Sequence, residues 1–155
     1  MTIGFLRHAE AESASKSDFD RKLTPKGLDQ AERVGKFCLR NGLLPDLLIT
    51  SPVVRARQTA GIFAKLTGCD LVEENWLACG MSPQNCLKEM GAFLHKDFVL
   101  LVGHEPDFSR AIAHLIGLPD SSALNIRKAS LTAVEVADFH AGDGRLQFSV
   151  PVRLM

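Results

Sequence analysis

The chain has 155 residues, close to the commonest size of a single domain, so we expect one domain over residues 1–155 and one core that needs no staples. Apolar residues make up 46% of the sequence and charged residues 23%, which is an ordinary globular composition. Because 18 basic residues balance 18 acidic ones, net charge gives no reason to expect nucleic acid or an anionic membrane as partner, and any preference for anions must come from a local cluster of positive charge.

The first half of the chain opens with an apolar run at residues 2–6, which ends abruptly at a charged pair and fits a buried strand. Residues 9–24 are small, polar and charged without a period, and we expect a loop there. A helix is predicted over residues 25–39, with Thr24 as its N-cap and Pro25 at its first position. The apolar positions at helical spacing in this segment are Leu28, Ala31, Val34 and Leu39.

The middle of the chain continues the alternation of strands and helices. Residues 46–50 are predicted to form a second strand, and Ser51-Pro52 repeats the cap-then-proline pattern, which predicts a helix from there to residue 66. A third strand is expected at residues 69–72. After a loop at residues 76–83, a helix is expected over residues 84–94.

The last part of the chain holds the cleanest strand pattern, at residues 98–102, followed by a helix at residues 108–116. Two more strands are expected at residues 131–136 and 146–150, joined by a short Gly-rich turn. Apolar strands alternating with helices are typical of a three-layer α/β/α domain with a largely parallel central sheet buried on both faces. The short connection between the last two strands predicts one antiparallel edge strand.

The N-terminal segment and the cysteines indicate in which cellular compartment the protein is expected. No basic segment precedes the N-terminal apolar run, which is shorter than a signal-peptide core, and no stretch approaches a membrane span. We therefore expect a soluble, cytoplasmic protein. The four cysteines form no Cys-x-x-Cys motif and match no common zinc spacing, which favours free thiols, although a Cys79–Cys86 disulfide stays open. We expect no metal and no cofactor.

Chemically active residue types follow three of the predicted strands. Arg7-His8 comes after the first strand, Arg55 lies in the helical turn after the second, and His104 follows the cleanest strand. Ligands of open α/β sheets bind beyond the carboxyl ends of the strands. Two histidines and two arginines at that edge are hard to explain as packing.

This combination of side chains favours a phosphate site. Guanidinium groups clamp phosphoryl oxygens with paired hydrogen bonds, and a helix that opens at Pro52 would add its N-terminal dipole and free N–H groups. A neutral imidazole is a competent nucleophile toward phosphorus. The sequence holds no Walker loop, no Cys-x5-Arg thiol site and no carboxylate cluster for magnesium, so a metal-free histidine route is expected.

Four blocks of the sequence resemble the signatures of the histidine phosphatase superfamily, also called phosphoglycerate mutase-like. They are an Arg-His-Ala signature, a Leu-Thr-x-x-Gly-x-x-Gln-Ala helix start, a Ser-x-x-x-Arg-Ala-x-Gln-Thr-Ala block and a second-histidine block, at residues 6–12, 23–31, 51–60 and 102–106. The blocks come in the family's order within residues 3–116, about three quarters of the chain. The short chain and residues 18–24 and 128–134 further resemble the SixA-type phosphohistidine phosphatases.

The resemblance implies roles for individual residues. His8 would be the nucleophile that takes the phosphoryl group, and Arg7, Arg55 and His104 would form the phosphate pocket. Arg21, in the loop after the nucleophile, is a candidate to reach the phosphate.

The proton donor is where the sequence departs from the family pattern. Larger members carry a glutamate after the third strand that protonates the leaving oxygen. Glu74 and Glu105 are the candidates in this sequence, and the plain interpretation is that neither is a dedicated acid. A phosphohistidine substrate fits that interpretation, because an imidazole leaves as a neutral base whereas an alkoxide needs a proton.

The leading hypothesis is therefore a phosphatase that removes phosphate from phosphohistidine on a signalling protein. A site with few residues to build a lid suits a phosphorylated side chain on another protein's surface. Two alternatives remain: a small-molecule phosphomonoesterase of the sugar-phosphate type on the same site, and a catalytically silent phosphate-binding module.

Overall fold

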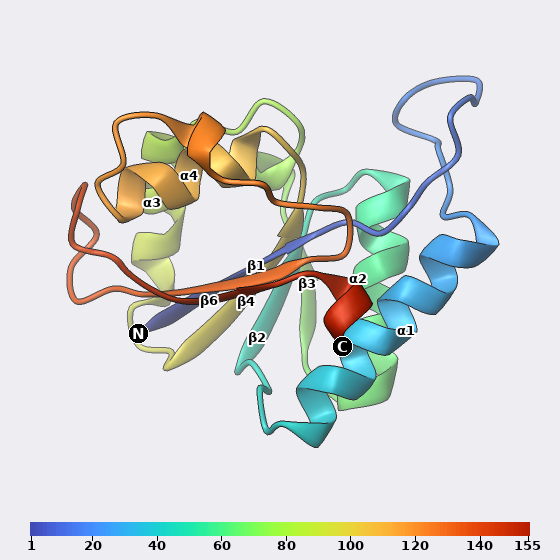
Figure 1. Ribbon diagram of the computed structural model, residues 1–155, viewed down its shortest axis with the longest axis horizontal. Helices are drawn as coiled ribbons and strands as arrows, with labels where there is room; N and C mark the ends of the chain where they lie inside the picture. Colours follow the sequence, from blue (N-terminus) through green and yellow to red (C-terminus); the bar gives the residue numbers. More distant parts are fainter.

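A computed structural model describes residues 1–155 as a six-stranded mixed sheet with helices on both faces (Figure 1). The strands are β1 (Thr2–Arg7), β2 (Leu47–Thr50), β3 (Leu71–Glu73), β4 (Phe98–Gly103), β5 (Leu131–Glu135) and β6 (Arg145–Val150). The helices are α1 (Pro25–Arg40), α2 (Val54–Thr67), α3 (Pro83–Met90) and α4 (Asp107–Leu115). The chain therefore forms the α/β sandwich that the alternating pattern predicts.

The strand order is β3-β2-β4-β1-β5-β6. The pairs β2–β3, β2–β4 and β1–β4 are parallel, whereas β5 is antiparallel to both β1 and β6. The predicted antiparallel pairing thus occupies the β5–β6 edge, and β5 is the strand that runs against all the others. Because β1, β4 and β2 are adjacent and parallel, their carboxyl ends meet at one edge of the sheet.

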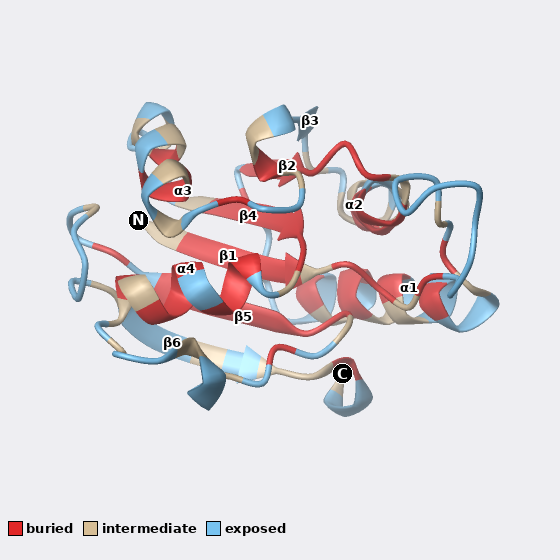
Figure 2. Cartoon of the chain, turned by 90° about the horizontal axis from the view of Figure 1, so that it is seen from above, coloured by how far each residue is buried: buried red, intermediate tan, exposed pale blue.

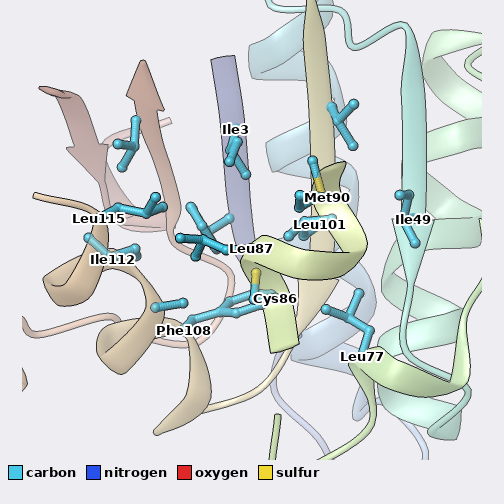
Figure 3. Packing of buried hydrophobic residues seen from close by; sticks show 14 of the residues in the cluster. Ile3, Ile49, Leu77, Cys86, Leu87, Met90, Leu101, Phe108, Ile112 and Leu115 are labelled. Carbon is cyan, nitrogen blue, oxygen red and sulfur yellow. The ribbon is translucent and has the colours of Figure 1, made fainter. Parts of the chain in front are cut away.

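The sheet separates two apolar cores. Alternate side chains of a strand point to opposite faces, so Phe5 joins the cluster under α3 and α4, whereas Leu6 joins the cluster under α1 and α2. In the first cluster, shown in Figure 3, the ring centroids of Phe5 and Phe108 lie 5.2 Å apart in an edge-to-face arrangement. Both faces of the central strands are therefore covered, which fixes their carboxyl ends rigidly.

The edge strands differ from the prediction that strands are buried on both faces. β1, β2 and β4 are buried along most of their length, whereas β3 is exposed throughout and β6 alternates between exposed and half-buried positions (Figure 2). Each of these two strands has a partner on one side only, at the ends of the sheet.

Helix α1 starts as predicted, since the Thr24 side chain accepts a hydrogen bond from the Gly27 backbone N–H at 3.0 Å. The predicted apolar face is wrong at two positions, because Leu28 and Leu39 are 43% and 51% exposed. The buried face uses small residues instead, namely Gly27, Ala31, Val34, Gly35 and Cys38. A Cβ atom at residue 27 would lie 1.9 Å from the Glu10 carbonyl oxygen, so the helix start can approach the loop after β1 only with glycine there.

Helix α2 begins at Val54 rather than at Pro52, and its N-cap, Val53, makes no side-chain hydrogen bond. The prediction that Ser51 caps this helix is wrong, because its hydroxyl faces His104 instead. Helix α3 begins at Pro83, capped by Ser82, and ends at Met90, earlier than predicted.

All four cysteines are free, with Cys86 buried and Cys79 exposed. The Cys79–Cys86 disulfide, which the sequence alone neither predicts nor excludes, is therefore not formed. No helix of the fold has the length and apolar character that crossing a membrane would require.

Candidate active site

The carboxyl ends of β1, β4 and β2 bring the predicted strand-end residues together. His8 follows β1, His104 follows β4, and Arg55 lies in the first turn of α2, after β2. The ring centroids of the two histidines are 5.3 Å apart, and Arg55 Nε lies 3.2 Å from His8 Nε2. His8, Arg55 and His104 are all buried, at 6%, 5% and 3% exposure.

The hydrogen bonds of His8 define which ring nitrogen is free. Its Nδ1 lies 2.7 Å from the carbonyl oxygen of Ala9. Since a carbonyl oxygen can only accept, Nδ1 carries the proton and Nε2 keeps its lone pair. The Nε–H of Arg55 donates to that lone pair, so Nε2 faces the arginine.

Burial keeps the His8 imidazole neutral. It lowers the pKa of His8 to about 3, with smaller contributions from the positive charges of Arg55 and Arg7, while the Ala9 carbonyl acts in the opposite direction. Moving a charged imidazolium out of water is unfavourable, and nearby cations disfavour it further. Between pH 5 and 8 the ring is therefore unprotonated at Nε2.

His104 presents a hydrogen-bond donor without an acceptor. Its Nε2 lies 2.7 Å from the hydroxyl of Ser51, and that oxygen also accepts from the Val53 backbone N–H at 3.3 Å. The serine hydroxyl hydrogen is thus free to be donated to Nε2, which favours the proton on Nδ1. Nδ1 is buried and has no partner, and burial, chiefly, lowers the pKa of His104 to about 4.

Arg7 is the last residue of β1, and its side chain is half-buried. One terminal nitrogen donates to the carbonyl oxygen of Ile126 at 2.8 Å, whereas its Nε is buried without a partner. Burial lowers the pKa of Arg7, and Glu105 acts in the opposite direction.

The guanidinium of Arg55 is engaged by the loop that follows β1. Its two terminal nitrogens donate to the Asp18 backbone carbonyl at 2.7 Å and to the Asp18 carboxylate at 3.0 Å. The second of these also lies 3.6 Å from the Cys79 sulfur. Two oxygens in the fork of a guanidinium resemble the way an arginine holds an oxyanion.

The other predicted site residues lie further out. Arg21 forms an ion pair with Asp18 at 2.8 Å and so reaches Arg55 through that residue. Glu105 is half-buried beside His104, and its carboxylate accepts a hydrogen bond from the Ser109 backbone at 3.0 Å, while burial raises its pKa. Glu74, after β3, uses its backbone N–H to reach the Thr50 carbonyl at 2.9 Å.

Three further residues support the site and were not predicted. Asp18 holds Arg55, and Asp107, buried at the start of α4, accepts hydrogen bonds from the backbone of Gly80 and Met81 beside Cys79. Ala129 has a positive φ of 54°, and its N–H is shared between the carbonyl oxygens of Arg7 and His8. The only feature of the sequence that indicates the contact of Ala129 with Arg7 and His8 is its small side chain, in the segment before β5.

Comparison with known proteins shows which family the chain resembles. Residues 3–78 match the family model of the histidine phosphatase superfamily (branch 1). Together with the four ordered motifs and the fold, this match makes the chain similar to the histidine phosphatase superfamily, with the matched residues covering about half of its length. A 2,3-bisphosphoglycerate-dependent phosphoglycerate mutase of Rhodococcus opacus is 36% identical over 49% of this chain, and the match covers 30% of that enzyme. The chain thus matches less than a third of the length of this mutase.

Solved structures share this fold over nearly the whole chain. A structure described as phosphohistidine phosphatase SixA of Agrobacterium tumefaciens is 25% identical, with a TM-score of 0.83 over 97% of both chains. Protein histidine phosphatase SixA in complex with tungstate has a TM-score of 0.89 over 99% of both chains at 19% identity. A protein described as an α-ribazole-5′-P phosphatase of Escherichia coli has a TM-score of 0.81 over 98% of both chains at 18% identity. The chain is thus similar in fold, over nearly its whole length, to SixA and to an α-ribazole-5′-P phosphatase.

Proposed function

We propose that this phosphatase removes the phosphoryl group from phosphohistidine on another protein, with His8 as nucleophile. The observation that carries the proposal is the state of the His8 ring. Its Nδ1–H is held by the Ala9 carbonyl, and the lone pair of Nε2 faces Arg55 at a buried position. A pKa of about 3 keeps Nε2 unprotonated at neutral pH, as a nucleophile requires.

The reaction takes place in two transfers. In the first, a bond forms between His8 Nε2 and phosphorus as the bond between phosphorus and the substrate imidazole breaks. The substrate ring, protonated at its other nitrogen, departs as a neutral base, and His8 becomes a phosphorylated ring that keeps its Nδ1 proton. In the second, water attacks phosphorus, dihydrogen phosphate leaves with both protons of that water, and His8 returns to its neutral form.

The groups around His8 stabilise the phosphoryl oxygens during both transfers. The guanidinium of Arg55 supplies a planar fork, and the unpartnered Nδ1 of His104 and Nε of Arg7 are buried donors that need an acceptor. Donors that are already oriented in a buried site stabilise developing charge without reorganisation. The Ala9 carbonyl has the matching role at His8, since it accepts from the ring that gains positive charge.

The choice of a P–N substrate rests on the proton donors. The Glu105 carboxylate is turned toward the backbone of Ser109, and Glu74 lies beyond β3 at the edge of the sheet. We assign neither the role of a dedicated acid. Without a donor, expulsion of an alkoxide is slow, whereas a neutral imidazole leaves readily.

A small-molecule phosphomonoesterase is the second candidate, and one observation favours it. Burial raises the pKa of Glu105, the neighbour of His104, which keeps the carboxyl protonated to higher pH. A protonated Glu105 that turned away from Ser109 would be a proton donor for an alkoxide leaving group.

We propose further that the reaction needs no metal and takes place in the cytoplasm. No group of three or more His, Cys, Asp or Glu side chains is arranged to hold a metal ion. Four free thiols are typical of a reducing compartment.

Comparison of three substrate classes tests the assignment. The expected order of kcat/KM is phosphohistidine protein, then aryl phosphate, then sugar phosphate. Glu74→Gln and Glu105→Gln should each leave phosphohistidine turnover within about tenfold, below the 10²-fold typical of a general acid. A sugar phosphate as best substrate, with its turnover abolished by one of the two glutamine variants, would make the protein a small-molecule phosphomonoesterase. No turnover of any substrate would identify a silent phosphate-binding module.

A further inference from the structure

A positively charged groove adjoins the active site on the side of β5 and β6. It encloses about 380 Å³. Six polar residues contribute to its lining, four of them basic: Arg7, Gln30, Asn125, Arg127, Lys128 and Arg153. No acidic side chain lines it. In a chain whose formal net charge is zero, four positive charges in one groove are a local excess.

No ion pair within the chain engages the charges in this groove. None of Arg7, Arg127, Lys128 and Arg153 takes part in an ion pair; the pairs that form involve Arg21, Lys26, Lys36, Arg55 and Arg57. Two acids act on these charges from outside the lining. Glu105 acts on Arg7, and Glu10, whose carboxylate is bound by Lys26 at 2.9 Å, acts on Lys128. The groove therefore has positive charge available for an external partner.

The groove meets the proposed phosphate site at Arg7. Arg7 lines it and precedes His8, and Arg127 and Lys128 belong to the loop whose Ala129 N–H is bonded to the carbonyl oxygens of Arg7 and His8. The far wall is the C-terminal turn, Val152–Leu154, which packs beside α1 (Figure 1). A chain presenting a phosphorylated side chain to His8 would thus place its neighbouring residues over these charges.

We infer that this groove binds an acidic segment of the protein substrate, next to the phosphorylated residue. The inference rests on the proposed function, because it assigns the same site a protein substrate. Arginine forks bind carboxylates in a bidentate way, and Gln30 and Asn125 add neutral hydrogen bonds. Exposed charges of this kind act on association rate and partner choice.

The groove variant combines Arg127→Gln, Lys128→Gln and Arg153→Gln. Arg127 and Arg153 are exposed and Lys128 is half-buried, so folding should be preserved. The matched control combines Arg40→Gln, Lys65→Gln and Lys88→Gln, which removes the same charge from exposed positions in the last turns of α1, α2 and α3.

Two measurements are made on wild type and both variants. The first is fluorescence anisotropy with a labelled acidic peptide without phosphate, its Gln/Asn counterpart and an RNA oligonucleotide of equal charge. The second is kcat/KM on a phosphohistidine peptide with acidic flanks, on its neutral-flanked counterpart and on an aryl phosphate. We expect the groove variant to lose about tenfold or more in acidic-peptide binding and in kcat/KM on the acidic phosphopeptide, at low salt. Aryl phosphate turnover and the control variant should be unchanged.

The outcomes separate this inference from the proposed function. Equal binding of acidic and neutral peptides by wild type, or an equal loss in the control variant, overturns the groove inference, as does tighter binding of RNA than of the acidic peptide. Failure of wild type to turn over either phosphohistidine peptide, with groove-dependent peptide binding intact, overturns the proposed phosphohistidine activity alone.

Discussion

At the scale of single residues, the site depends on which hydrogen bonds are already made. The Ala9 carbonyl fixes the His8 tautomer, and the Ser51 hydroxyl orients His104. The two buried nitrogens that have no hydrogen-bond partner are His104 Nδ1 and Arg7 Nε. An oxyanion beside His8 would provide the acceptors that these two buried groups lack, which supports the proposal of a phosphoryl group at this position.

Replacing Arg55 with lysine tests the need for a planar guanidinium. Lysine keeps the charge but loses the fork that now holds two Asp18 oxygens. We expect Arg55→Lys to lower kcat by about 10²–10³-fold, the usual loss for one oriented electrostatic donor. Arg57→Lys is the matched control, since Arg57 lies two positions on and pairs with Glu73 instead. A loss below about threefold would mean that Arg55 is not part of the phosphate pocket.

The depressed pKa values of the two histidines predict how stability depends on pH. In the unfolded chain both imidazoles titrate near 6.5, whereas in the folded protein the pKa is about 3 for His8 and about 4 for His104. Between these values the unfolded state binds more protons, so the free energy of unfolding falls as pH is lowered from 7 to 5, by roughly 1–2 kcal/mol per histidine.

Urea unfolding at pH 7 and pH 5 measures this dependence. The His8→Gln/His104→Gln double variant should show a clearly flatter dependence than wild type. If wild type is equally stable at both pH values, the histidines are not held neutral by burial.

At the scale of elements, the loop between β1 and α1 restrains the proposed phosphate site. It is attached at its base by the Ala11–Leu23 bridge, and its Asp18 occupies the fork of Arg55. The Asp18 side chain is 65% exposed and carries an ion pair with Arg21 as well. An incoming phosphate must therefore compete with the Asp18 oxygens for Arg55.

Asp18→Asn tests this competition. Loss of the carboxylate charge should lower the inhibition constant of inorganic phosphate by about threefold to tenfold. The reason is that phosphate then displaces a weaker electrostatic interaction between residue 18 and Arg55. Asp20→Asn in the same loop is the control, since the Asp20 carboxylate is bonded only to Ser17. Weaker inhibition by phosphate in Asp18→Asn would show that Asp18 orients Arg55 for binding rather than competing with the ligand.

The sequence predicted the elements that bear local signals. Thr24-Pro25 marks the start of α1, and the apolar run before Gly103-His104 marks the end of β4, so the two strand-end histidines could be placed. The start of α2 was misplaced, because Ser51-Pro52 looks like a cap while the Ser51 hydroxyl pairs with His104, 53 residues away. A preference for capping is local and weak, and a buried contact with a distant residue overrides it.

At the scale of the whole molecule, the predicted sheet and layers are correct because a parallel sheet needs cover on both faces. The convergence of His8, Arg55 and His104 follows from the adjacency of β1, β4 and β2, whereas the alternation of elements implies only that these strands are parallel. Asp18 could not be foreseen, because its loop has no periodic pattern and its contact with Arg55 spans 37 residues. The basic groove depends likewise on the C-terminal turn lying beside α1, which no local pattern encodes.

Trapping the covalent intermediate tests the central claim most directly. A rapid quench with a labelled phosphohistidine protein, in a buffer containing a metal chelator, should leave acid-labile, alkali-stable label on His8. His8→Ala should show neither label nor turnover, while His140→Ala, at an exposed position outside the site, should behave like wild type. Turnover by His8→Ala at the wild-type rate, or activity that the chelator abolishes and a divalent cation restores, would contradict the account.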